Sequence, residues 1–126
     1  RMIAFDTNHL LRHVLDDDPR QCKRVRSLIE SAEAADQQIH LLDLVIMETC
    51  WVLQSAMGFD RDDWCHVLEQ LLHDPAFCFD DASRLWRALD RYQTGKADFD
   101  DYLILGQAES LGAKLETFDK KLRKEL

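Results

Sequence analysis

The sequence has few of the residues that cross-link or interrupt a chain. Its 126 residues include four cysteines, two prolines and four glycines, and the cysteines form no Cys-x-x-Cys pair. No apolar run approaches the roughly 20 residues of a membrane span, and no segment resembles a cleavable leader. We therefore expect a cytoplasmic protein with no membrane segment. Its thiols should be free and mostly buried, and its folding should need no disulfide.

Positive charge is scarce as well. Lys and Arg number 16 against 24 Asp and Glu, which gives a net charge of −8. A protein that binds nucleic acid by bulk electrostatics needs a basic face, so the composition argues against that class. The acidic excess leaves room for a cluster that holds a divalent cation. The length and the ordinary balance of apolar and charged residues predict one globular domain over residues 2–126.

Short apolar runs alternate with longer amphipathic stretches. Strands are predicted at residues 2–5, 39–42, 77–79 and 114–118. Helices are predicted at residues 8–15, 19–35, 43–57, 60–73, 81–92, 98–111 and 120–126. Strands that alternate with helices need crossover connections and form a parallel sheet. The expected fold class is therefore α/β, a three-layer sandwich in which helices flank a short parallel sheet of about four to five strands.

Two aspartates directly follow expected strands. Asp6 comes after the first strand and Asp119 after the last one. Ligands of a parallel α/β sheet bind beyond the carboxyl ends of its strands, which predicts that both residues lie at the functional edge. Each aspartate could instead simply cap the helix that follows it.

Glu48 lies on an apolar stripe of its predicted helix, between Leu44 and Trp51. A glutamate at such a position is expected to face the core or a cleft, where a carboxylate is unfavourable unless it is paired or bound to a metal. An internal salt bridge is the alternative, with a distant Arg or Lys as the partner. Because residues 43–59 contain no basic side chain, a functional role is favoured.

Three aspartates open the helix predicted at 98–111. Asp98 and Asp101 are three residues apart and share a helix face, and Asp101 also heads an inward apolar row. Asp100 should lie about 200° around the helix from Asp98 and face solvent. Favourable interaction with the helix dipole would explain Asp98 and Asp100, but it leaves the inward position of Asp101 unexplained.

Carboxylates directed to one edge repel one another unless a cation neutralises them. Their hard oxygens select Mg²⁺ or Mn²⁺ over zinc. No Ser or Cys has an obvious nucleophilic role, so the pattern predicts metal-assisted hydrolysis of a phosphodiester, with one or two ions. The crowding also predicts that neutralising Asp6 or Glu48 leaves the metal-free protein equally stable or more stable.

Taken in order, these segments resemble PIN-domain ribonucleases, especially the VapC-type toxins of type II toxin–antitoxin pairs. The resemblance covers essentially the whole chain and is carried by residues 2–8, 47–53, 97–101 and 117–119. It implies a PIN-like fold and a Mg²⁺-dependent endoribonuclease, with Mn²⁺ as a substitute ion. It also implies a cognate antitoxin that inhibits the enzyme, and a homodimer is expected as a second interface.

The resemblance implies roles for individual residues. The family's metal-binding acids match four positions here: Asp6, Glu48, Asp101 and Asp119. Asp98 matches an additional catalytic acid of the subgroup that reads Ala-Asp-Phe, and Thr7 and Thr117 match hydroxyls that orient the acids. Tyr102 departs from the pattern, which has a small residue there, and Asp100 adds a charge with no assigned role.

Basic and apolar side chains suggest where partners bind. Arg12, Lys120 and Lys121 are candidates for contacts with RNA phosphates. The helix at 19–35, with Trp51 and Trp64, leaves surface for a partner helix. Another helix carries His9 four residues before His13, the spacing of a zinc pair, but the glutamate of a metalloprotease is missing. A surface position is therefore the simpler expectation for His9, and contact with substrate is the alternative.

Two other functions fit the sequence less well. A haloacid-dehalogenase-type phosphatase also begins with a strand and an aspartate, but Asn8 occupies the place of its second aspartate. A catalytically silent domain that only binds RNA or a partner is the other alternative. Such a domain has no need for the carboxylates that are all present here, so metal binding separates the two possibilities.

Overall fold

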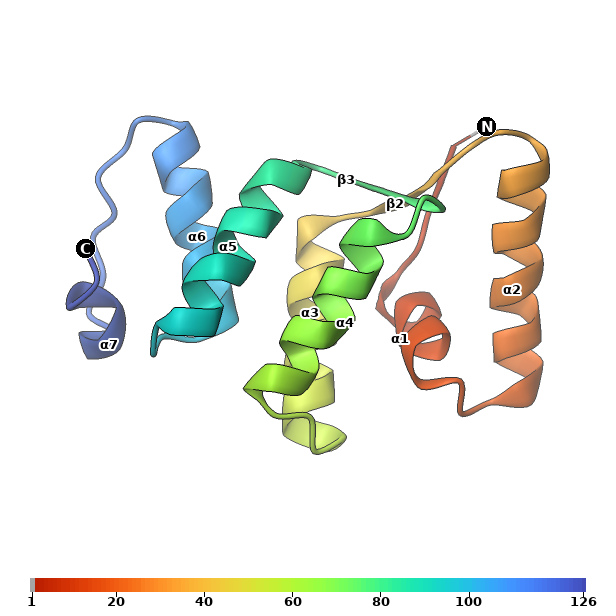
Figure 1. The fold of residues 1–126 in the computed structure, drawn as a ribbon, viewed down its shortest axis with the longest axis horizontal. Helices are drawn as coiled ribbons and strands as arrows, with labels where there is room; N and C mark the ends of the chain where they lie inside the picture. Colours follow the sequence, from red (N-terminus) through yellow and green to blue (C-terminus); the bar gives the residue numbers. More distant parts are fainter. Residues whose placement is uncertain (1) are drawn as a thin grey trace.

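The computed structural model describes residues 2–126, in which helices dominate and three short strands form the sheet (Figure 1). In chain order the elements are β1 (Ile3–Ala4), α1 (Thr7–Leu15), α2 (Pro19–Ala34), β2 (Ile39–Leu41), α3 (Asp43–Ala56), α4 (Arg61–His73), β3 (Phe77–Phe79), α5 (Ala82–Thr94), α6 (Phe99–Ser110) and α7 (Lys120–Arg123). The helices agree with the predicted ranges to within a few residues, except that α7 is shorter than expected. Apolar periodicity and capping residues were thus sufficient to locate them.

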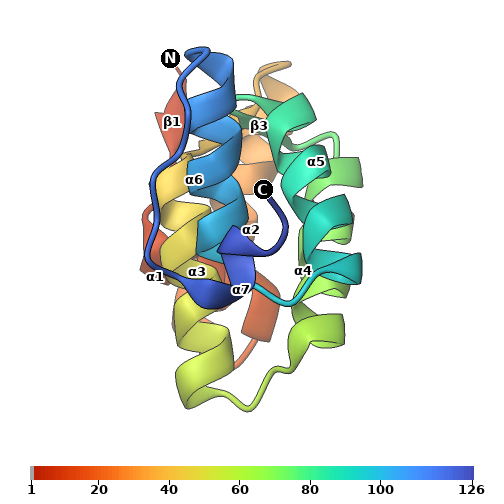
Figure 2. The same cartoon turned by 90° about the vertical axis from the view of Figure 1, so that its left-hand side faces the viewer.

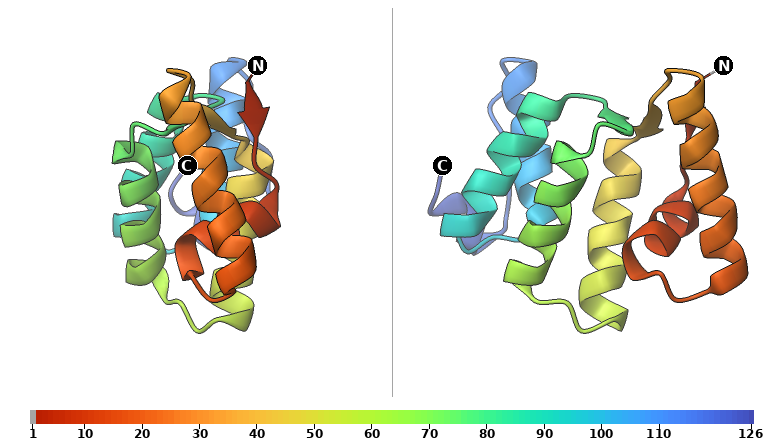
Figure 3. Two further views of the ribbon diagram at one scale, coloured as in Figure 1. Left: turned by 90° about the vertical axis from the view of Figure 1, so that its right-hand side faces the viewer. Right: turned by 45° about the vertical axis from the view of Figure 1, so that its right-hand side comes forward.

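The three strands form a parallel sheet in the order β1-β2-β3. Ile39 of β2 is in register with Ile3 on one side and with Phe77 on the other. The strands lie between the α1–α2 pair and the group formed by α3 to α6 (Figure 3, right). This arrangement confirms the predicted α/β sandwich.

The expected count of four to five strands is wrong for the described residues, because residues 114–118 form no strand. This segment runs in an extended conformation along α6 toward α7, at the end of the molecule farthest from α2 (Figures 1 and 2). Leu115 and Thr117 are half-buried while their neighbours are exposed, and the side chain of Phe118 is 97% exposed. The alternation of apolar and polar residues predicts an extended segment with one side against the protein. It does not reveal whether a strand or a helix covers that side.

The core lies where the inner faces of the helices meet the sheet. The predicted inner face of α4, formed by Trp64, Val67, Leu68 and Leu71, is buried. All four cysteines are free, as expected, and only Cys78 among them is half-buried rather than buried. Within the described part of the chain, no helix combines the length and the apolar character that crossing a membrane requires.

A buried ion pair joins three helices. Arg84 of α5 donates from Nη2 to Oδ2 of Asp43 at 2.6 Å, and Gln107 of α6 donates to the same oxygen at 3.2 Å. The two charged side chains are only 14% and 9% exposed. Gly106 of α6 makes this approach possible, because a Cβ there would lie 2.9 Å from Cγ of Arg84. Glycine is unfavourable inside a helix. The close approach of the Arg84 side chain explains why α6 has one at position 106.

The start of α3 is capped from another part of the chain. The sequence predicts that Asp43 caps its own helix, but Leu42 occupies the cap position and its side chain makes no capping bond. Instead, the carboxylate of Asp80, which follows β3, accepts a hydrogen bond from the backbone N–H of Asp43 at 2.9 Å. Asp43 is thereby free to pair with Arg84.

Removal of Arg84 tests the buried ion pair. We expect Arg84→Met to lower the free energy of unfolding by about 3–5 kcal/mol, because the charge of Asp43 then remains buried without a partner. Urea denaturation of the metal-free protein measures the loss. The double variant Arg84→Met with Asp43→Leu should recover much of it, since no buried charge is left.

Arg91 provides the matched control. It forms a two-bond ion pair with Glu109, but these side chains are 33% and 44% exposed, so solvent screens the pair. Arg91→Met should therefore lower stability by less than about 1 kcal/mol. Equal losses in Arg84→Met and Arg91→Met would show that burial of the Arg84 pair has no special importance.

Candidate metal centre

Three carboxylates gather at the start of α6. One oxygen from each of Asp98, Asp100 and Asp101 lies within 4.8 Å of the others. The backbone N–H of Asp98 donates to Oδ2 of Asp101 at 3.2 Å, and Oδ1 of Asp100 accepts from the N–H of Asp101 at 2.9 Å. Asp98 and Asp100 are exposed and Asp101 is half-buried, as predicted for Asp100 and Asp101.

Asp100 lies closer to Asp98 than a helical wheel predicts. The predicted angle of about 200° assumes that both residues are helical. Asp98 instead has φ −78° and ψ 158°, an extended conformation that places it just outside the helix as its N-cap. Its side chain can therefore approach Asp100, which gives Asp100 a place in the cluster that the sequence alone did not indicate.

Burial and the charges of neighbouring acids alter the titration of Asp101. Burial raises the pKa of the Asp101 carboxyl above its ordinary value, and the nearby charges of Asp100, Asp119 and Asp98 raise it further. Asp119 thus lies close enough to act on Asp101, although it is not within the group of three. Carboxylate oxygens that repel one another form a donor set suited to a hard divalent cation.

Two local hydrogen bonds fix the position of Asp119. The hydroxyl of Thr117 accepts a hydrogen bond from the N–H of Asp119 at 3.1 Å. One oxygen of Asp119 in turn caps α7 by accepting from the N–H of Leu122 at 2.8 Å. Asp119 is therefore both a helix cap and a neighbour of the acidic cluster. The capping role is confirmed, and the functional role of Asp119 stays a prediction, because the segment 114–118 before this residue forms no strand.

Asp6 follows β1 as predicted, and it accepts two hydrogen bonds from His9. Its Oδ1 accepts from the backbone N–H of His9 at 2.8 Å and from Nδ1 of the same residue at 2.7 Å. These contacts lower the pKa of Asp6. The expectation that neutralising Asp6 leaves the metal-free protein equally stable or more stable stays a prediction, and the hydrogen bonds from His9, which favour the ionised form of Asp6, act against it. The spacing of three residues between Asp6 and His9 is the sequence feature from which this contact could have been predicted.

Glu48 lies on the outside of α3. Its side chain is exposed and makes no hydrogen bond or ion pair with any residue from 2 to 126, so the structural salt bridge is not observed. The expectation that it faces the core is therefore wrong, and a position at a cleft stays a prediction. The helix has a second apolar stripe, and Leu44 and Trp51 on that stripe are 70% and 69% exposed.

A small cavity connects the side of α3 with the acidic cluster. Its volume is about 180 Å³. It is lined by Met47, Cys50, Trp51, Gln54, Asp98, Phe99 and Asp100. Burial raises the pKa of the Cys50 thiol to about 12, and the charges of Asp100 and Asp98 contribute. Residues on both sides of Glu48 therefore border the space in front of the acids.

The candidate cations lie on two sides of the molecule. Arg12 is half-buried and paired with Asp17 at 2.9 Å, and it lines a cavity of about 330 Å³ together with Asp6 and His9. Lys120 and Lys121 are exposed in the first turn of α7, directly after Asp119. Thr7 opens α1 next to Asp6 and is half-buried.

The fold and the acidic cluster define a small α/β domain suited to holding a divalent metal ion. A model of the PIN domain family matches residues 3–124, and the chain belongs to that family. PIN domains are generally metal-dependent nucleases, and the group of Asp98, Asp100 and Asp101 fits such an ion. Neither the curated proteins nor the solved structures gave a match.

Neutralising Asp101 tests the repulsion within the cluster. Folding raises the pKa of Asp101 above its ordinary value of 3.8. The wild-type protein therefore loses stability relative to Asp101→Asn as the pH rises from 3.8 through the higher pKa of the folded state. We expect no difference below about pH 3.8 and a more stable variant at pH 7, by less than about 1 kcal/mol because solvent screens the charges.

Thermal unfolding at both pH values, with and without Mg²⁺, measures these effects. Mg²⁺ at 100 times its Kd should stabilise the wild-type protein by about 2.7 kcal/mol and Asp101→Asn by much less. The control is Asp90→Asn, which changes an exposed aspartate of α5 outside the cluster. A loss of metal-free stability in Asp101→Asn at pH 7 would contradict the repulsion.

Proposed function

We propose that the protein is a Mg²⁺-dependent endoribonuclease of the cytoplasm and the toxin of a toxin–antitoxin pair, with Mn²⁺ as a substitute ion. The observation that carries this proposal is the convergence of Asp98, Asp100 and Asp101, with Asp119 beside them, in a chain of the PIN domain family. Single-stranded or loop RNA is the proposed substrate.

The metal ligands we propose are Asp6, Glu48, Asp101 and Asp119, and Asp98 is a further catalytic acid. The metal ion, when bound, supplies an activated water and stabilises the charge on the phosphate. Burial is the main cause of the raised pKa of Asp101, and the charges of Asp100, Asp119 and Asp98 add to it. A cation would relieve this added repulsion, which supports the assignment. The exposed position of Glu48, free of protein partners, leaves it available as a ligand.

Neighbouring side chains prepare these acids. The contact with His9 keeps Asp6 ionised, and the hydroxyl of Thr117 holds the backbone of Asp119. We propose that Thr7 has the corresponding orienting role beside Asp6. Arg12, Lys120 and Lys121 would contact RNA phosphates, and Lys120 and Lys121 are the closest in sequence to the acids.

The exposed stripe of α3 supports the partner interactions. Leu44 and Trp51 are two turns apart on its outer surface, and large exposed apolar side chains commonly mark protein interfaces. We propose that surfaces of this kind serve the cognate antitoxin and a homodimer. Trp64, expected to contribute, is fully buried and plays no part.

Cleavage of RNA tests the enzymatic proposal. The purified protein should cleave single-stranded or loop RNA in Mg²⁺ or Mn²⁺ and stop in EDTA. Asp101→Asn should lower the rate by about 100-fold or more, the usual size of a catalytic electrostatic contribution, while Asp90→Asn should not change it. Cleavage that persists in EDTA, or is equal in Asp101→Asn, would contradict the proposal. Metal binding without cleavage would indicate a silent binding domain.

Expression in cells tests the biological role. Production of the wild-type protein alone should arrest growth, and production of Asp101→Asn should not. Sequencing of RNA ends after brief expression would then identify the substrate. A monomer by light scattering at high concentration, together with the absence of a neutralising protein encoded beside it, would count against both the antitoxin and the homodimer.

A further inference from the structure

Tyr102, which departs from the small residue expected beside Asp101, lies at the centre of a hydrogen-bond cluster. Its side chain is buried. The hydroxyl donates to the carboxylate of Glu125, whose oxygens are 2.7 Å and 2.8 Å away, and accepts from the backbone N–H of Ala97 at 3.2 Å. The carboxylate of Glu125 also accepts from the backbone N–H of Lys96 at 3.3 Å. One side chain of α6 thus connects the α5–α6 turn to the segment 119–126.

Gly95 provides the space for this cluster. Its φ of −93° is accessible to any residue, so backbone conformation does not require a glycine. A Cβ at this position would overlap the hydroxyl of Tyr102 and the carboxylate of Glu125. From the other side, the guanidinium of Arg61 donates to the carbonyl of Gly95 at 3.1 Å and to that of Ala97 at 2.9 Å. The turn that precedes the acidic cluster is thereby fixed from two sides.

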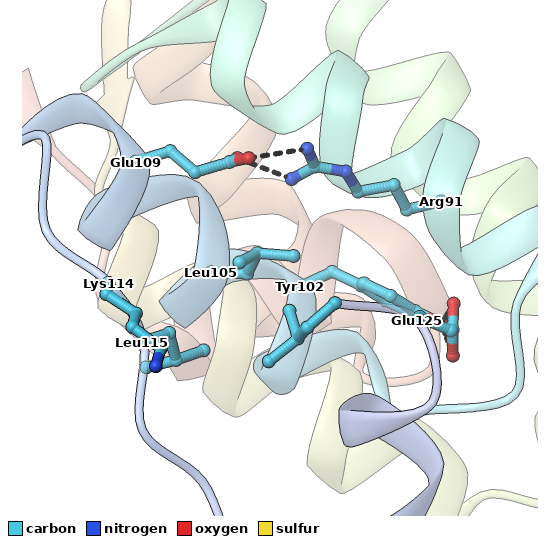
Figure 4. A pocket seen from close by; sticks show the side chains of 8 residues that line it. Arg91, Tyr102, Leu105, Glu109, Lys114, Leu115 and Glu125 are labelled. Carbon is cyan, nitrogen blue, oxygen red and sulfur yellow. Dashed lines mark hydrogen bonds and ion pairs between the residues drawn. The ribbon is translucent and has the colours of Figure 1, made fainter.

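The chain around Asp119 has few other anchors. The stretch 111–118 is mostly exposed, and a cavity of about 430 Å³ separates it from α5 and α6. Figure 4 shows Tyr102 and Glu125 at one end of this cavity and the Arg91–Glu109 ion pair at another part of its wall. Beyond Asp119, Leu122 is the one buried side chain among residues 119–126. Glu125 therefore provides the main polar attachment of this segment.

We propose that Tyr102 and Glu125 form a latch that holds the segment 119–126 on α6 and so keeps Asp119 beside Asp101. Both are positioning residues, because they act on the acids through the backbone. The inference rests on the proposed function in one respect, namely that Asp119 and Asp101 bind the same metal ion. The latch itself is a property of the metal-free chain.

Mn²⁺ binding to the metal-free protein, followed by electron paramagnetic resonance, tests the latch without an RNA substrate. Glu125→Ala and Tyr102→Phe should each weaken Mn²⁺ binding by about 10-fold, as expected for residues that orient ligands. Glu125→Gln should restore near-wild-type binding, since its amide oxygen can accept from the Tyr102 hydroxyl. That rescue would exclude a general effect of the carboxylate charge.

Glu109→Ala is the matched control. Glu109 lines the same cavity and bonds to Arg91, but it does not contact the segment 119–126. Its replacement should leave Mn²⁺ binding unchanged. Wild-type affinity in Glu125→Ala, or an equal loss in Glu109→Ala, would overturn the latch.

Hydrogen exchange separates failure of the latch from failure of the proposed function. The backbone N–H groups of Leu122 and Arg123 donate to the side-chain and main-chain oxygens of Asp119, and they should exchange faster in Glu125→Ala than in Glu109→Ala. If the wild-type protein binds no Mn²⁺, the proposed function fails, and these exchange rates alone decide about the latch. Equal rates in the two variants would then overturn it.

Discussion

The burial of a single guanidinium constrains most of this fold. Arg84 of α5 reaches Asp43 of α3 because α6 has a glycine, Gly106, where the Arg84 side chain passes it. Asp43 is held in turn by Asp80, whose other oxygen contacts His40 of β2 at 2.6 Å. A series of polar contacts therefore connects β2 and the residue after β3 with the helices α3, α5 and α6. Because unpaired buried charge is strongly unfavourable, these contacts allow little variation in the angle at which α6 meets α3.

This constraint determines where the acids lie. Helix α6 begins with the acidic cluster, and α3 borders the same small cavity, so a fixed α6 fixes the separation between the cluster and the α3 side chains that line the cavity. The turn before α6 receives additional support from Arg61. Asp119 differs, because it comes from a segment that packs loosely. The candidate site thus combines a rigid part with a part that depends on a few side chains.

Local sequence signals predicted the helices and the inward position of Asp101, because periodicity and caps depend on residues only a few positions apart. Three features could not be obtained in this way. The course of residues 114–118 depends on which surface covers them, and the exposure of Glu48 depends on which of two apolar stripes the rest of the chain buries. The contact between Tyr102 and Glu125 joins residues 23 positions apart, so no local pattern reveals it.

The thiol of Cys50 has a consequence for the chemistry of the site under oxidising conditions. Thiolates, rather than thiols, react with peroxides and disulfides. With a pKa of about 12, only about one Cys50 in 100,000 is ionised at pH 7. Burial also raises the pKa of Cys65 and Cys78. Burial, with a contribution from the charges of Asp100 and Asp98, thus keeps the sulfur beside the acidic cluster protonated, so oxidants should leave this thiol unmodified.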